Sequence, residues 1–432
     1  MHKLRSYWVD VDVESVDKKE YAACPVGRPS ALQTRQNDCR IVAHRGLAFR
    51  LRSNSGGRRM RKSVCVVGAG LSGAVIAHEL ACAGFECDVI EARGHVAGNC
   101  HTQRDPATGI LVHAYGPHIF HTGNERVWSY IQRFDEFVPF VNRVRAVAGG
   151  QVYSLPINLS TINQFFGKMF SPEQAREFLN AAADRSIRNP RSFEEQALRF
   201  VGRELYEAFF KGYTIKQWGV DPAELPASIL KRLPVRFNYD DSYYDSKYQG
   251  MPRHGYTHIV EKMLDHRNIH LALNTTFSRK DAAQACHTFY SGPLDAWFGF
   301  SEGRLGYRTL DFAAERHTGD FQGNPVINYC DAEVPWTRIC EHKHFAPWDS
   351  HEGTVVFKEF SRSCGEGDDP CYPIRLVNDK RILGSYERMA AEESGVTFVG
   401  RLATYRYLDM DVTIEEALQA SAQFIACASA AA

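Results

Sequence analysis

The chain has 432 residues, enough for two or three domains and a large hydrophobic core. Its 51 lysines and arginines balance 51 aspartates and glutamates, which argues against a nucleic-acid binder acting through whole-domain positive charge. Charged residues interrupt every long apolar stretch, so we expect no membrane span. The 12 cysteines include no CxxC pair, and we expect reduced thiols in a cytoplasmic protein rather than a disulfide framework or a zinc ribbon.

Residues 1–62 differ in composition from the rest of the chain. Between Arg28 and Lys62 there are ten basic residues and one acidic residue, Asp38. The first 20 residues include five acidic residues, which a transit peptide should lack. We therefore predict a poorly ordered extension, with Met60 as a candidate start of the protein.

The folded part begins with a predicted strand–helix–strand unit. An apolar run at 63–67 is typical of a buried parallel strand, residues 74–83 have helical spacing, and residues 87–91 form a second strand. The turn after the first strand has glycines at 68, 70 and 73, and Glu91 follows Gly70 by 21 residues. Glycines and an acidic residue at this spacing predict a dinucleotide site.

Each residue of this pattern has a physical role. Gly68 permits the tight turn, Gly70 lets the backbone approach a pyrophosphate, and Gly73 allows close helix–strand packing. The helix N-terminus offers free N–H groups and positive partial charge to the phosphates. Glu91 can accept hydrogen bonds from ribose hydroxyls and disfavours a 2′-phosphate, which leaves NAD and FAD open. The arginine and glycines in 92–99 resemble the second phosphate-contacting segment of flavoproteins, which favours FAD.

The rest of the chain alternates between helical and strand patterns. Residues 158–236 are mostly helical, with interruptions at Pro172, Pro190 and Pro222. Short β-type runs at 307–310, 326–329 and 354–357 predict an antiparallel sheet, and a helix is expected to end near 419–424. The predicted fold class is α/β, with a Rossmann-like domain, an inserted helical domain and an antiparallel sheet domain.

Four longer motifs resemble the bacterial UDP-galactopyranose mutase family. They are Tyr115–His121 (YGPHIFH), Lys211–Gly219 (KGYTIKQWG), Gln322–Asn328 (QGNPVIN) and Tyr405–Met410 (YRYLDM). The resemblance extends from about residue 63 to about 424. Two departures, Ala97 for the usual glycine and Ser72 for a frequent phenylalanine, are small enough for a phosphate loop.

The resemblance implies an isomerase that interconverts UDP-galactopyranose and UDP-galactofuranose with reduced FAD and no net redox change. In this family the sugar is held covalently on flavin N5 during ring contraction. It implies a cellular reductant such as NAD(P)H and a homodimer. It also implies an FAD domain from 63–135, 251–298 and 377–425, a helical domain at 157–240, and a sheet domain from 136–156 and 299–376.

The resemblance also assigns residues to roles. Arg232 and Arg338 are expected to stabilise the departing diphosphate, facing the ligand rather than holding a core, and His121 to act beside the flavin. Expected substrate-binding residues are Asn142, Phe209, Tyr213, Thr214, Trp218, Tyr243, Asn328, Tyr372 and Tyr407. Expected cofactor-binding residues are Gly68, Gly70, Leu71, Ser72, Gly73, Glu91, Ala92, Asn99, His118, Ile119, Arg401, Asp409 and Met410.

Metal sites and other functions were weighed against this interpretation. His118 and His121, and His342 and His344, have spacings that could bind metal. No third ligand is apparent for the first pair, and the family uses no metal, so none is expected. The rival functions are an FAD-dependent oxidoreductase of the amine-oxidase type and a non-catalytic nucleotide-binding protein. The first should lack the paired arginines and the aromatic residues for uridine, and the second could lose the flavin contacts.

Overall fold

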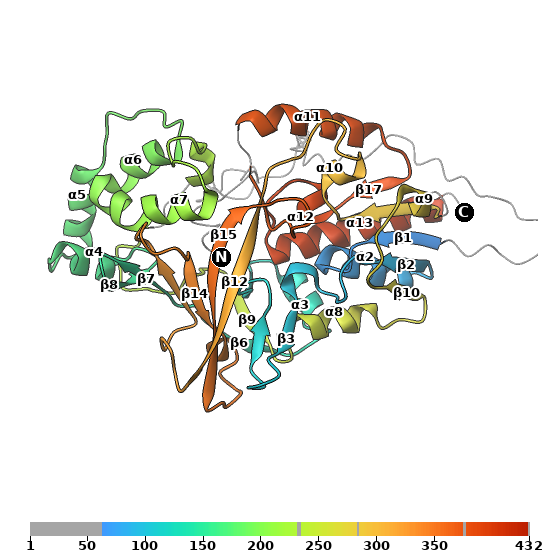
Figure 1. The fold of residues 1–432 in the computed structure, drawn as a ribbon, viewed down its shortest axis with the longest axis horizontal. Helices are drawn as coiled ribbons and strands as arrows, with labels where there is room; N and C mark the ends of the chain where they lie inside the picture. The colour runs from blue at the N-terminus through green and yellow to red at the C-terminus, as the bar shows by residue number, and fades with distance from the viewer. Residues whose placement is uncertain (1–62, 231–234, 283–284, 375–376, 431–432) are drawn as a thin grey trace, which may run out of the picture.

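The computed structural model describes residues 63–230, 235–282, 285–374 and 377–430. The extension 1–62 and the segment containing Arg232 therefore lie outside the described residues. In Figure 1, a parallel sheet with its helices forms one lobe and a group of helices forms the other. The long strands of a second sheet run between the two lobes.

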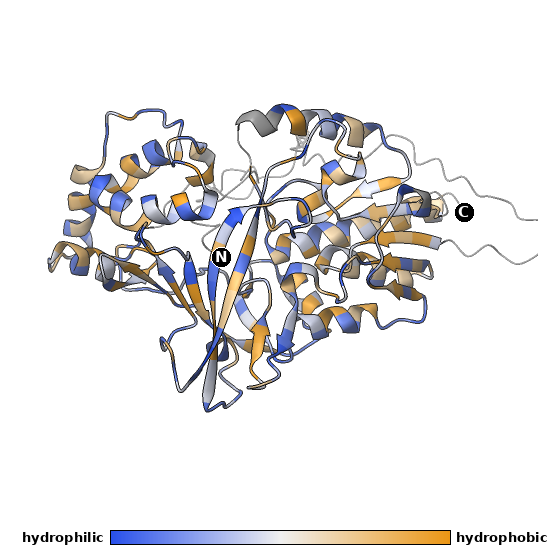
Figure 2. Cartoon of the chain, viewed as in Figure 1, coloured by the Kyte–Doolittle hydropathy of each residue, from blue (hydrophilic) through white to orange (hydrophobic). Residues whose placement is uncertain are grey.

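The parallel sheet joins segments that are far apart in the sequence. Its strand order is β10(Ile269–Ala272), β2(Glu86–Ile90), β1(Ser63–Val67), β11(His287–Tyr290) and β17(Val396–Phe398). Residues 64–67 of β1 are all buried, as the apolar run predicted. The predicted helix after β1 is α2(Leu71–Cys82), and it packs against α8(Tyr256–Leu264) and α13(Met410–Ala430). Figure 2 shows hydrophobic residues gathered in these strands and helices.

The second sheet is the one predicted to be antiparallel. Its strand order is β16(Tyr372–Pro373), β12(Tyr307–Thr318), β15(Gly353–Ser363), β14(Arg338–Glu341), β13(Val326–Tyr329), β7(Val144–Ala148) and β8(Gln151–Leu155). Among the described strands of this sheet, all neighbours pair antiparallel except β13 and β7, which are parallel. A parallel pair needs a long connection between its strands. Here the whole helical lobe separates β7 from β13 in the sequence.

The helical lobe contains six described helical segments, of which the first three have side-chain caps at their N-termini. They are α4(Leu159–Phe166), α5(Pro172–Ala182), α6(Phe193–Leu205), the π-helix η2(Tyr206–Lys211), α7(Gly212–Trp218) and η3(Ala227–Leu230). Pro172 begins α5 rather than interrupting a helix, and Ser171 and Gln174 complete a capping box there. The π-helix leads directly into α7, so the segment with the KGYTIKQWG motif is one continuous helical rod.

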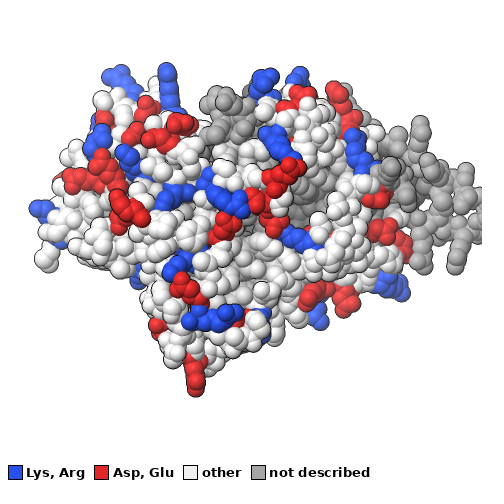
Figure 3. Space-filling view, viewed as in Figure 1, with Lys and Arg blue, Asp and Glu red and all other residues white. Residues whose placement is uncertain are grey.

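Further elements lie between those named above in the sequence. They are η1(Gly98–Cys100), β3(Thr102–Arg104), β4(Leu111–His113), β5(Phe120–Thr122), α3(Glu125–Ile131), β6(Phe137–Pro139), β9(Tyr248–Pro252), α9(Arg279–Ala282), α10(Leu294–Trp297), η4(His342–Phe345), α11(Val377–Glu392) and α12(Gly400–Ala403). Strand β9 lies between β5 and β6 in a three-stranded sheet. None of the described helices is long and apolar enough to cross a membrane. Basic and acidic side chains are interspersed over the face shown in Figure 3, in keeping with the balanced composition.

A buried histidine in the parallel sheet makes stability depend on pH. Burial lowers the pKa of His287 in β11 to about 4, below its usual 6.5. Between these two values the unfolded chain binds more protons than the folded chain, so stability falls as pH falls. From pH 7.5 to 5.5 we expect His287 to account for a loss of about 1 kcal/mol.

The measurement is the free energy of unfolding at both pH values, for the parent and for His287→Gln. The variant should lose less stability on acidification, whatever its stability at pH 7.5. His351→Gln, in the loop before β15, is the control and should behave like the parent. Equal pH dependence in the parent and in His287→Gln would contradict the assignment.

Candidate functional site

Two glycines of the turn after β1, Gly68 and Gly73, have no room for a side chain. Gly68 has φ +97°, and a Cβ on it would lie 2.2 Å from Ser291 Oγ. A Cβ on Gly73 would lie 1.9 Å from the Gly68 carbonyl oxygen. Gly70 caps α2 without a side-chain hydrogen bond, and Gly98 faces it across the turn. The backbone at the helix N-terminus can therefore be closely approached by a phosphate, as predicted.

Glu91, which directly follows β2, stabilises this turn. Its side chain is buried, and one carboxylate oxygen accepts from Ala69 N at 2.8 Å while the other accepts from Arg93 N at 2.9 Å. A carboxylate has about four lone-pair sites, so acceptor capacity remains for ribose hydroxyls. Arg93, which follows Ala92, donates to the predicted cofactor residue Asn99 at 2.9 Å. The predicted segment 91–99 is thus held as one unit.

The late cofactor segment lies against the same edge of the parallel sheet. A Cβ on Gly400 would lie 2.6 Å from Ser72 Oγ, so α12 approaches the start of α2 closely. Arg401 on α12 lies with its guanidinium carbon 4.5 Å from the centre of the Tyr407 ring and 5.8 Å from that of Tyr372. It also donates to the Leu408 carbonyl at 2.8 Å, just before Asp409 and Met410 at the start of α13. Arg401 therefore connects the predicted cofactor and substrate residues.

The YGPHIFH motif lies between the two sheets. His118 Nδ1 donates to the Gly116 carbonyl at 2.8 Å, and Ile119 is fully buried. His121 in β5 stacks on Tyr244 with ring centres 3.8 Å apart, and its Nδ1 lies 3.0 Å from Ser246 Oγ. Burial raises the pKa of Tyr244 well above its usual value, and among the charged groups around it are Asp409 and Arg338. Through Tyr244, His121 is therefore linked to Asp409, a predicted cofactor residue, and to Arg338, a predicted catalytic residue.

Arg338 is paired with a carboxylate that the sequence analysis missed. Arg338 Nε and Nη2 both donate to one oxygen of Glu359, at 2.8 and 2.7 Å, and both side chains are fully buried. Burial alone would lower the pKa of Arg338, but the Glu359 carboxylate outweighs it and holds the pKa well above its usual value. The guanidinium therefore stays charged without contact with solvent.

This burial corrects one part of the expectation for Arg338, namely that it does not hold a core. Arg338 and Glu359 are register partners on β14 and β15, and Gly116 of the YGPHIFH motif lies directly over the pair. Removing the arginine would leave a carboxylate buried without its partner. Arg338 is therefore part of the structural interior as well as a candidate catalytic residue.

Several predicted substrate residues carry buried polar atoms with no hydrogen-bond partner among the described residues. They are Asn142 Oδ1 and Nδ2, Thr214 Oγ1, Asn328 Oδ1 and Arg338 Nη1. Asn328 lies opposite Arg338 in the β13–β14 register. Buried polar groups are almost always hydrogen-bonded in folded proteins, and a missing partner calls for an explanation. A polar ligand between β13, β14 and α7 would offer partners to Asn328, Arg338 and Thr214, which these three elements carry.

Aromatic residues lie around these polar atoms. Tyr213 and Trp218 are buried on α7, and the charge of Arg338 reaches Tyr213. Tyr372 and Tyr407 stack with ring centres 5.3 Å apart. The Tyr243 backbone N–H donates to the Asn142 carbonyl at 2.8 Å, which brings these two predicted residues together. Phe209 packs instead on Tyr153 of β8 and Phe165 of α4, where the helical lobe meets the second sheet.

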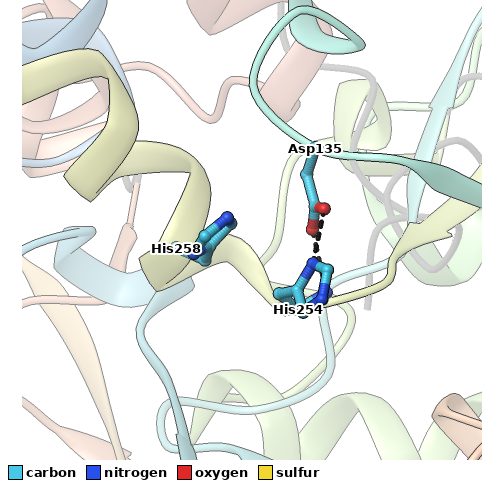
Figure 4. A group of neighbouring side chains, drawn as sticks. All are labelled: Asp135, His254 and His258. Carbon is cyan, nitrogen blue, oxygen red and sulfur yellow. Dashed lines mark hydrogen bonds and ion pairs between the residues drawn. The ribbon is translucent and has the colours of Figure 1, made fainter.

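Two groups of side chains have the composition of a metal site. In Figure 4, Asp135 and His254 point at each other, with His258 on the adjacent helix. Both Asp135 oxygens already accept from His254, from its ring Nδ1 and from its backbone N–H, each at 2.8 Å. In the second group, Asp320, Glu341 and His344, Glu341 accepts three backbone N–H bonds from residues 321–323. In each group, the carboxylate oxygens of Asp135 or Glu341 therefore already accept hydrogen bonds from neighbouring segments of the fold.

The comparisons with known proteins agree with this geometry. Residues 66–134 match a family described as an NAD(P)-binding Rossmann-like domain, and residues 208–407 match one described as UDP-galactopyranose mutase. A Klebsiella pneumoniae protein described as a probable UDP-galactopyranose mutase is 57% identical over 84% of this chain and 95% of its own length. The chain belongs to the UDP-galactopyranose mutase family. The predicted family and its enzyme class, an isomerase, are confirmed.

Other relatives of the family support the fold and raise a question of substrate. A crystal structure of reduced UDP-galactopyranose mutase superposes with a TM-score of 0.67, covering 85% of this chain and 96% of that one at 14% identity. At that identity it shows the fold alone, and the predicted α/β class with a Rossmann-like domain is confirmed. An Escherichia coli protein described as dTDP-fucopyranose mutase is 50% identical over 84% of this chain and 98% of its own length.

Some site residues were missed, and the sequence held a signal for only part of them. Glu359 follows Val355 and Phe357 at alternate positions of β15, so strand periodicity would have placed its charge on the inward face. Ser246 beside His121 gave no signal, since it comes from a segment without periodicity. Lys216 lies inside the KGYTIKQWG motif, but nothing in the sequence indicated that its ammonium donates to four backbone carbonyls.

The buried ion pair generates a prediction about stability. Arg338→Ala leaves Glu359 buried without a partner, and we expect a loss of about 3–5 kcal/mol in unfolding free energy. In the double variant Arg338→Met/Glu359→Gln, most of this loss should be recovered, because no charge remains buried. Chemical denaturation of the three proteins measures both effects. If Arg338→Ala is as stable as the parent, the pair does not hold the interior.

Proposed function

We propose that this chain interconverts UDP-galactopyranose and UDP-galactofuranose in a site bounded by β13, β14, α7 and the glycine turn. One observation carries the proposal: Asn142, Thr214, Asn328 and Arg338 have buried polar atoms without a hydrogen-bond partner among the described residues, and Thr214 shares α7 with Tyr213 and Trp218, two of the aromatic residues expected to hold a nucleotide. A nucleoside diphosphate offers both the acceptors and the flat ring that such a site requires.

The residues at the edge of the parallel sheet fit FAD. The glycine turn leaves the N-terminus of α2 open to a pyrophosphate, and Glu91 retains acceptor capacity for a ribose. The segments with His118, Ile119, Arg401, Asp409 and Met410 would hold the rest of the cofactor. When bound in its reduced form, FAD would supply an electron pair for attack on the anomeric carbon of the sugar.

The protein's own residues would handle the negative charge of the leaving UDP. Arg338 is kept ionised and fixed in orientation by Glu359, and its Nη1 atom is the part left to donate to a diphosphate oxygen. A donor fixed before the reaction does not have to reorganise as charge develops, which is what lowers the barrier. Arg232, outside the described residues, is proposed as the second cation. Tyr372 and Tyr407 are proposed to add hydroxyl donors.

On the opposite wall, α7 would hold the nucleoside. Tyr213 is proposed to stack on the base, and Thr214 and Trp218 to line the nucleotide and sugar site. Phe209 packs with Tyr153 and Phe165 behind this wall and would support it. Tyr243, joined to Asn142 through a backbone hydrogen bond, would complete the floor near the diphosphate. His121, stacked on Tyr244, is proposed to set the environment of the flavin ring.

A second candidate substrate is a dTDP-6-deoxy sugar, because one relative at 50% identity is described as dTDP-fucopyranose mutase. The two substrates differ at the base methyl, the ribose 2′-hydroxyl and the sugar C6 hydroxyl. The relative described as a probable UDP-galactopyranose mutase has the higher identity, 57%. We therefore favour the UDP-sugar.

Further parts of the proposal concern the setting of the enzyme. We propose a cytoplasmic homodimer whose flavin is reduced by NAD(P)H, as the family resemblance implies. Purification without detergent, light scattering, and anaerobic bleaching of the flavin by NADPH or NADH would test these three points separately.

Turnover should require reduction of the cofactor. With dithionite under argon, we expect the purified protein to convert UDP-galactofuranose to UDP-galactopyranose, measured by separation of the two UDP-sugars. Under air without reductant, conversion should be negligible, because the electron pair needed at the anomeric carbon is absent. Robust turnover in air, or net consumption of oxygen with an amine, would contradict the proposal and favour an oxidase.

Substrate preference is measured in the same assay. We expect kcat/KM for UDP-galactofuranose to exceed that for dTDP-fucofuranose by about tenfold or more, since a site that pairs with substrate hydroxyls rejects an analogue lacking them. A reversed preference would assign the chain to the dTDP-sugar reaction while leaving the ring-contraction chemistry in place.

A further inference from the structure

The Lys216 ammonium lies in a cage of backbone carbonyls, and the reaction chemistry described above does not use it. Its Nζ donates to four carbonyl oxygens at the end of β13 and in the connection from β13 to β14. They belong to Tyr329 at 2.7 Å, Asp331 at 2.8 Å, Val334 at 3.0 Å and Trp336 at 3.1 Å. An ammonium has three hydrogens, so every donor is used and at least one is shared. Burial lowers the pKa of Lys216 to about 8. Lys216 makes no ion pair with any described residue. Its ammonium is therefore held in place by these four carbonyls.

The caged connection joins the strands that carry Asn328 and Arg338. Residues 330–337 link β13 to β14, and the two caged carbonyls at its ends belong to residues 329 and 336. Asn328 and Arg338 lie opposite each other where this connection begins and ends. Any change in the path of the connection would therefore move both side chains.

Lys216 itself lies on the other wall of the proposed site. It is on α7 between Thr214 and Trp218, so the same seven-residue helix carries the nucleoside wall and the ammonium. The approach of α7 to the connection is close: a Cβ on Gly212 would lie 2.3 Å from the Cys330 carbonyl oxygen. The C-terminal end of α7 is tied to the sheet as well, because Ser361 Oγ donates to the Gln217 carbonyl at 2.8 Å.

We propose that Lys216 is a positioning residue that fixes the distance between the nucleoside wall on α7 and the diphosphate-binding pair Asn328 and Arg338. The proposal rests on the proposed function. A UDP-sugar has a fixed separation between its base and its diphosphate, so both ends can be held only if the two walls keep the matching separation. A cation shared by four carbonyls is suited to this role because it holds the whole turn rather than one atom.

The experiment compares Lys216→Met with Lys211→Met, a control at an exposed lysine one turn earlier. We expect Lys216→Met to retain its flavin while UDP affinity, measured by calorimetry, and kcat/KM fall by about 10- to 100-fold. Lys211→Met should match the parent in both. UDP affinity does not require turnover, so a parent that binds UDP without mutase activity would contradict the proposed function and not this role.

A double-mutant cycle separates positioning from general loss of stability. Asn328→Ala should weaken UDP binding in the parent, but by a factor at least about threefold smaller in the Lys216→Met background, where Asn328 is already displaced. Independent, multiplicative losses would overturn the proposal, as would UDP affinity in Lys216→Met within twofold of the parent.

If Lys216→Met cannot be purified with flavin, hydrogen exchange of the parent protein decides. UDP should slow exchange in residues 330–337 and in α7 together, because the cage makes them one unit. Protection of α7 with unchanged exchange in 330–337 would overturn the proposal.

Discussion

The buried pair of Arg338 and Glu359 is the interaction on which the candidate site depends. A guanidinium without solvent needs a carboxylate to remain charged, and the carboxylate in turn needs the guanidinium. Two of the three guanidinium nitrogens face Glu359, so the third is fixed in direction. Thr337 Oγ1 lies 3.2 Å from the other Glu359 oxygen and completes the arrangement. Burying the two charges costs free energy, but the pair holds one donor, Arg338 Nη1, in a single orientation.

Other features of the fold converge on this pair. Gly116, whose carbonyl accepts from His118, lies over it, so the YGPHIFH motif, proposed to contact the flavin, meets strands β14 and β15 there. The long strand β15 that carries Glu359 also pairs with β12, whose neighbour β16 begins with Tyr372. A shift in the second sheet would therefore move residues of the proposed cofactor site and of the proposed substrate site together.

The parallel sheet contributes a second constraint at its carboxyl edge. The turns after β1 and β11 and the start of α12 approach so closely that Gly68 and Gly400 have no room for side chains. Glu91 uses both its oxygens to hold the turn, so the residue expected to contact ribose is also structural. The residues at these positions are required by the fold and are also expected to contact a cofactor. This double requirement explains why the region could be recognised from the sequence.

The sequence by itself determined the βαβ unit, the glycine turn, the Rossmann-like dinucleotide-binding domain and the family, because each depends on local spacing or on long contiguous motifs. It also gave the identities of the polar and aromatic residues around the candidate site. Only the tertiary structure decided that Arg338 is buried with Glu359, that β13 lies parallel to β7, and that Lys216 holds the connection between Asn328 and Arg338. These features join segments separated by 21 to nearly 200 residues. Local patterns specify what a segment forms, whereas the pairing of a charge depends on which distant strand lies beside it.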